Sequence, residues 1–188
     1  MGKCGLKGYP KPLSYEYTKK IKEQMEKNIC KIEIGDKRSI GFFCKIPFPT
    51  KDKMLNALIT NNPINNEDIL NDNIQNISLK IKEDEEHKEI HLNNRIIYTN
   101  KEYNTTIIEI KDEDEINYYL ELDDNIINDI LYNNNKNSKY KDKTIYIIQY
   151  QEGELSLSYG IYKMLIKKIN IILIINVAQE KVYQAHQY

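Results

Sequence analysis

From residue 28 onward the chain is a succession of short β-prone segments separated by turn residues, and this pattern most constrains its fold. Residues 29–34 alternate apolar and polar side chains, as a half-buried strand does. Similar segments predict strands at residues 40–46, 55–60, 74–82, 88–92, 95–99, 105–110, 116–122, 144–150 and 155–161. Asn, Pro, Asp and Gly interrupt the series, as expected for turns. Many short strands with turn signals predict an all-β barrel or sandwich.

One helix is expected before the strands, at residues 14–27. Tyr17, Ile21 and Met25 recur at four-residue spacing with Lys and Glu between them, and the segment contains no Pro or Gly. The sequence therefore predicts a short amphipathic helix that precedes an all-β domain.

Charge and cysteine content exclude several classes of partner. The formal net charge is −1 and the basic residues are interleaved with acids, so we expect no nucleic-acid partner. The apolar stretch at residues 169–175 is far shorter than the roughly 20 residues that cross a bilayer, so no membrane partner is expected. Three cysteines and a polar, Gly-rich start favour a cytoplasmic protein without disulfides. Gly2 and Cys4 would suit acylation, but Leu6 stands where that pattern has Ser or Thr.

Two groups of side chains could be taken for metal sites. His87 and His91 lie four residues apart, but on a strand this spacing separates them by roughly 13 Å. The acidic run at residues 83–86 and the segment at residues 71–73 lack the glycine and the spaced ligands of a calcium loop. We expect two solvent-facing strand histidines, a solvated hairpin tip, and no metal or cofactor.

Five segments, in order, resemble the trypsin-like serine peptidase family. Residues 40–44 (IGFFC) resemble the strand that opens the first barrel, and residues 58–62 (LITNN) the strand that delivers the catalytic His. Residues 103–110 (YNTTIIEI) resemble the strand that delivers the catalytic Asp. Residues 146–150 (YIIQY) and 157–160 (LSYG) resemble the opening strands of the second barrel. The resemblance implies two β-barrels packed together, with the active site in the cleft between them.

The catalytic groups that the family needs are missing from these segments. The chemistry requires a nucleophilic Ser, a His as general base and an Asp that orients the His. Pro63 stands at the position of the His and Asn104 at that of the Asp, and no G-x-S-G-S-P or G-D-S-G-G-P motif supplies the Ser. The resemblance therefore implies a pseudoenzyme, an inactive homologue in a family that carries out proteolysis.

The codons of residues 176–188 allow an explanation for the missing Ser. When the third base of each codon is joined to the first two of the next, a permitted reading is CSTGKGLSGSPI, which contains the nucleophile motif. We expect that a frameshift shortly before Asn176 replaced the catalytic segment with an unrelated tail. The protein would then be a truncated member of the family.

The expected organisation follows from this resemblance. Residues 1–27 form an N-terminal tail and helix, residues 28–130 the first barrel, and residues 131–143 a polar linker. Residues 144–188 form an incomplete second barrel with the unrelated tail. An opened barrel exposes strand edges, so we expect self-association through residues 144–175. The alternative function is a module that captures an extended peptide by strand addition, and the third is an active peptidase that uses other residues.

Overall fold

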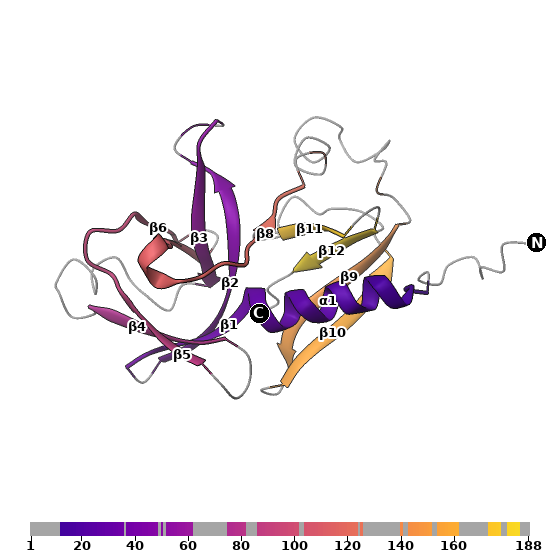
Figure 1. The fold of residues 1–188 in the computed structure, drawn as a ribbon, viewed down its shortest axis with the longest axis horizontal. Coiled ribbons are helices and arrows are strands. Elements are labelled where there is room, and N and C mark those ends of the chain that lie inside the picture. Colours follow the sequence, from indigo (N-terminus) through magenta and orange to yellow (C-terminus); the bar gives the residue numbers. More distant parts are fainter. Residues whose placement is uncertain are drawn as a thin grey trace, which may run out of the picture. The chain divides into compact units, whose positions relative to one another are not determined.

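The computed structural model is mostly β, with one helix near its start (Figure 1). It divides into two compact units, Glu23–Glu121 and Met1–Lys22 together with Leu122–Tyr188. The structure describes residues 12–35, 37–48, 50, 52–61, 75–81, 86–101, 104–123, 125, 140, 143–151, 154–161, 173–177 and 180–184.

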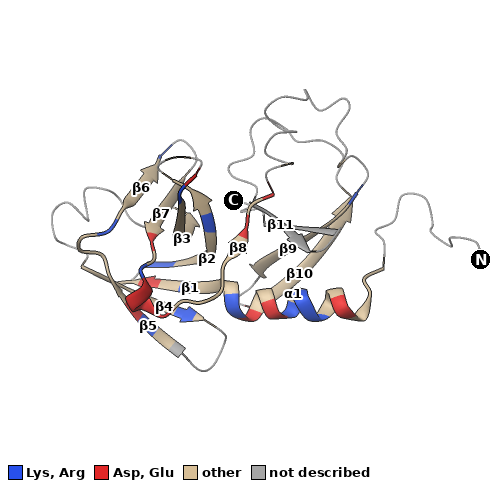
Figure 2. Ribbon diagram, turned by 45° about the horizontal axis from the view of Figure 1, so that its top comes forward, with Lys and Arg blue, Asp and Glu red and all other residues tan. Residues whose placement is uncertain are grey.

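The helix α1 spans Tyr15–Asn28, which confirms the predicted helix to within one residue at each end. Ser14 precedes it, and the Ser14 Oγ accepts a hydrogen bond from the Tyr17 backbone N–H at 3.4 Å, as an N-cap does. Basic and acidic residues follow one another along the helix (Figure 2). Glu23 and Lys27, one turn apart, form an ion pair at 2.6 Å. No helix in the described part of the chain is long and apolar enough to cross a membrane.

The larger unit is built on one sheet with the strand order β5-β4-β1-β2-β3-β7-β6. Every neighbouring pair along this path is antiparallel, and β8 pairs in parallel with β2. The strands are β1 (Ile29–Ile34), β2 (Lys37–Pro47), β3 (Met54–Asn61), β4 (Asn76–Ile81), β5 (Glu86–His91), β6 (Ile97–Asn100), β7 (Thr105–Glu109) and β8 (Leu120–Glu121).

The sheet curls because its two end strands are consecutive in the chain. Only residues 92–96 separate β5 from β6. The Leu92 N–H still bonds to the Gln75 carbonyl beside β4, at 2.7 Å, whereas the Ile96 carbonyl accepts from Glu109 of β7, at 2.8 Å. The backbone thus changes partner from one end of the sheet to the other. This gives a barrel-like, all-antiparallel path, as the sequence pattern predicts.

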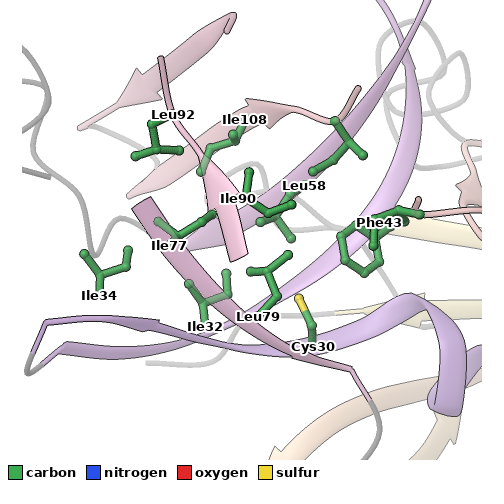
Figure 3. Packing of buried hydrophobic residues seen from close by; sticks show 12 residues of the cluster. Cys30, Ile32, Ile34, Phe43, Leu58, Ile77, Leu79, Ile90, Leu92 and Ile108 are labelled. Carbon is green, nitrogen blue, oxygen red and sulfur yellow. The ribbon is translucent and has the colours of Figure 1, made fainter. Parts of the chain in front are cut away.

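A cluster of buried apolar side chains fills the inside of this curl (Figure 3). The alternation in β1 decides which side chains enter it, since Cys30, Ile32 and Ile34 are buried while Lys31 and Glu33 are not. The other members are Phe43, Leu58, Ile77, Leu79, Ile90, Leu92, Ile108, Ile110 and Ile116.

The predicted strand at residues 116–122 is wrong over most of its length. Only Leu120 and Glu121 pair with β2, as β8. Upstream of it the chain forms a single 3-10 turn, η1 (Asp112–Asp114), followed by Glu115 in the left-handed region at φ 55°. The Asp114 carboxylate holds this turn by accepting the Lys111 N–H at 2.8 Å. A side chain that bonds its own backbone competes with strand pairing.

The second unit contains a sheet with the order β10-β9-β12-β11. Its strands are β9 (Thr144–Gln151), β10 (Glu154–Ile161), β11 (Leu173–Val177) and β12 (Glu180–Gln184). β9 and β10 confirm the predicted pair of strands, and they are antiparallel over eight residue pairs. β12, which lies in the expected unrelated tail, pairs in parallel with β9.

Candidate functional site

The ends of β3 and β7 bring two of the motif segments together. These strands are antiparallel from Ala57 opposite Glu109 to Asn61 opposite Thr105. Asn104 directly precedes Thr105, and Pro63 follows Asn61 by two residues. Pro63 itself lies outside the described residues. The segment that resembles the His-bearing strand and the segment that resembles the Asp-bearing strand therefore meet where β3 ends and β7 begins.

Asn104 occupies a left-handed turn position at the start of β7. Its φ is 47°, and its N–H donates to the Lys101 carbonyl at 3.4 Å. Asn adopts this conformation more readily than most residues, because its short polar side chain can bond locally. The amide carries no charge, so it cannot stabilise an imidazolium as a carboxylate would.

Hydroxyl and amide groups gather at the same end of β3. The buried Thr60 Oγ1 donates to the Ile40 carbonyl at 2.8 Å and lies 2.9 Å from the Ser39 Oγ. The Ser39 Oγ also donates to the Asn61 Oδ1. On the neighbouring strands, the hydroxyls of Thr99 and buried Thr106 are 3.3 Å apart. Each of these hydroxyls has a neutral hydrogen-bond partner, and a hydroxyl needs a base to become a nucleophile.

The two described histidines lie on β5, as the alternation predicts. Both His87 and His91 are exposed, opposite Lys80 and Asn76 of β4. The His91 Nδ1 is 2.6 Å from the Asn76 Oδ1. β5 does not pair with β3, because β4, β1 and β2 lie between them in the sheet order.

Some of the other residues considered as metal ligands or nucleophiles lie outside the described part of the chain. Within the described ranges, no group of three or more His, Cys, Asp or Glu is arranged to hold a metal ion. Residues 71–73, Cys4 and most of the acidic run at residues 83–86 lie outside those ranges. Cys30 and Cys44 are buried free thiols. Burial raises the pKa of both thiols above the ordinary range, to about 12 for Cys44, so neither is a ready nucleophile.

A buried ion pair that the sequence patterns did not reveal lies at the connection between β5 and β6. The Arg95 Nη2 donates to the Asp114 Oδ1 at 2.7 Å, and the Arg95 Nη1 donates to the Glu109 carbonyl at 3.1 Å. Burial and the carboxylates of Asp114 and Asp112 raise the pKa of Tyr119 to about 12. The sequence contained one signal for this pair. Only two of the 27 basic residues are Arg, the residue that suits buried ion pairs better than Lys.

Comparisons of the chain with models of known families, with curated proteins and with solved structures found no match.

Proposed function

We propose that this protein is a catalytically inactive homologue of the trypsin-like serine peptidases, with a chymotrypsin-like fold. The observation that carries the proposal is the pairing of Asn61 with Thr105. In the family, the strands that deliver the catalytic His and Asp must place these residues close together. Here the matching strands pair, while the matching positions hold Pro63 and Asn104.

The curled sheet of the larger unit supports the first of the two expected barrels. The path from β5 to β6 contains the strands matched to the barrel opening, to the His position and to the Asp position. Gly41, in the barrel-opening motif, packs so closely that an added Cβ would lie 2.7 Å from the Ile32 Cδ1. The close packing therefore requires glycine at the position where the family motif also has glycine.

The residues at the end of β3 favour an inactive protein over an active peptidase. Proline has no titratable group, so Pro63 cannot accept a proton from a nucleophile. Ser39, on β2 beside this end of β3, is hydrogen-bonded to Thr60 and Asn61 and has no histidine beside it in the described structure. Without a base, its hydroxyl stays protonated at neutral pH.

A serine-reactive fluorophosphonate probe tests the absence of peptidase chemistry. We expect no labelling of the folded protein and no cleavage of a fluorogenic peptide mixture. An active trypsin-like peptidase is the positive control, and the heat-unfolded chain measures non-specific labelling. Labelling that exceeds the unfolded control and is lost in Ser39→Ala would overturn the proposal, because it would identify a working nucleophile.

A second candidate function is capture of an extended peptide by strand addition. The observation that favours it is β10, which ends the described sheet with β9 as its neighbour on one side. A free strand edge offers main-chain hydrogen bonds to a partner strand. Fluorescence polarisation with labelled extended peptides would detect binding, and mass spectrometry would show whether they stay intact. Cleaved peptides would contradict both candidates.

A further inference from the structure

The end strand β10 continues the apolar face of its neighbour β9. Its alternate residues Leu155, Leu157, Tyr159 and Ile161 share one face, because side chains alternate along a strand. In register, Tyr159 lies opposite Tyr146 of β9 and Leu157 opposite Ile148, and both of these β9 residues are buried. On β10 itself, however, Tyr159 is 67% exposed.

Within the described residues, β10 itself also carries none of the sequence features that keep edge strands from pairing with other chains. Natural edge strands are protected by charged residues, by proline or by bulges. Residues 155–161 contain neither a charged residue nor a proline, and β10 pairs with β9 without a bulge along all eight residues. A strand that adds here would extend the hydrogen-bond ladder and place its own alternate side chains beside those of the apolar face.

We propose that the occupant of this edge is β10 of a second copy of the chain, antiparallel and related by a two-fold axis at Ser158. In this register Leu157 lies opposite the partner's Tyr159, and Leu155 opposite the partner's Ile161. The other face pairs Ser158 with the partner's Ser158 and Ser156 with the partner's Gly160. A shift by one residue would set the apolar face of one strand against the polar face of the other.

The sequence of β10 favours a second copy over an unrelated peptide. Two-fold pairing needs one surface that complements itself. Centring on Ser158 pairs the whole uncharged stretch, residues 155–161, with itself and leaves Glu154 outside the paired stretch. This inference needs only the hairpin of β9 and β10, so it stands or falls independently of the proposed peptidase ancestry.

Opposite charges at Ser158 test the register directly. Ser158→Lys and Ser158→Glu each place two like charges opposite one another across the two-fold axis, which disfavours pairing. We expect the dissociation constant of the dimer to rise on the order of tenfold or more in each variant. An equimolar mixture of the two variants should restore the dimer, because unlike charges then face each other. Sedimentation velocity over a concentration series distinguishes the 22.3 kDa chain from its dimer.

Two further variants keep the result interpretable. Gln149→Lys adds the same charge one strand inward, on β9, and should leave the dimer intact. Tyr159→Lys changes an exposed side chain, so it should fold and still weaken the dimer, with circular dichroism reporting the fold. A wild-type chain that stays monomeric at every concentration would overturn the proposal. So would a dimer that tolerates both charges at Ser158, or a monomer whose β10 edge binds an extended peptide instead.

Discussion

Arg95 and Asp114 form a bidentate ion pair in which the two side chains are only 2% and 4% exposed. The pair joins the segment where the chain changes partner, between β5 and β6, to the 3-10 turn η1. Buried charges are tolerated when they are paired and hydrogen-bonded. The pair therefore fixes the connection on which the curl of the larger sheet depends.

Asp114→Asn should strongly destabilise the protein, because it leaves the Arg95 guanidinium without its buried counter-charge, and the remaining carboxylate, Glu113 at 3.8 Å, is 70% exposed. Breaking a buried pair on one side costs about 3–5 kcal/mol, and urea denaturation would measure the loss. Glu33→Gln is the matched control, since its pair with Arg38 spans 3.5 Å between side chains that are 47% and 85% exposed. That exposed pair should contribute less than about 1 kcal/mol. Equal losses in the two variants would contradict the structural role of Arg95.

Gly41→Ala should destabilise the larger unit by overpacking its core. The new Cβ would lie 2.7 Å from the Cδ1 atoms of Ile32 and Leu58 and 3.2 Å from the Ile59 carbonyl oxygen. Adding a methyl group to a well-packed core costs about 1–3 kcal/mol, which thermal denaturation would report as a lower Tm. Gly160→Ala is the control, because the nearest atom to its Cβ is 3.9 Å away. A Tm that falls equally in both variants would show that Gly41 is not required by packing.

The buried thiols predict a loss of stability at alkaline pH. Burial raises the pKa of Cys44 from 9.0 to about 12. A raised pKa in the folded state contributes stability that is complete below the pKa of the unfolded state and is lost as pH rises towards the folded value. The free energy of unfolding should therefore fall between about pH 9 and 12. Tyr119 acts in the same direction, so the decisive comparison is with Cys44→Ala, whose stability should fall less steeply.

The same thiols should resist modification in the folded protein. The thiolate is the reactive form, and raised pKa values keep Cys30 and Cys44 protonated at neutral pH. In a Cys4→Ser background, a thiol-specific chromogenic reagent should detect neither cysteine until the chain is unfolded in guanidinium. Fast modification of the native protein would show that these side chains are accessible.

The nucleotide sequence across the codons of residues 161–188 tests the expected frameshift before Asn176. We expect the second reading frame to encode Gly-Leu-Ser-Gly-Ser-Pro, since the codons permit it. Finding this motif would support descent from an active serine peptidase. A second frame without the motif would contradict the frameshift, while leaving the argument from Pro63 and Asn104 unchanged.

Local sequence patterns predicted most elements of the fold. Period-two alternation located β1 at residues 29–34, and four-residue spacing located α1. The failure at residues 116–122 has a specific cause, because the Asp114 carboxylate bonds the Lys111 N–H and a distant arginine. The alternation of Ile116, Tyr118 and Leu120 could not reveal that competing interaction.

The sequence by itself determined which residues stand at the positions that the proposed homology assigns to the catalytic base and its orienting acid, namely Pro63 and Asn104. Only the tertiary structure decided which strands pair with one another. Asn61 meets Thr105 because β3 pairs with β7, and the connection between β5 and β6 is tied to the turn η1 by an ion pair between Arg95 and Asp114, 19 residues apart. Local periodicity reports the faces of single elements, whereas strand order and buried charge pairs depend on contacts between residues distant in the chain.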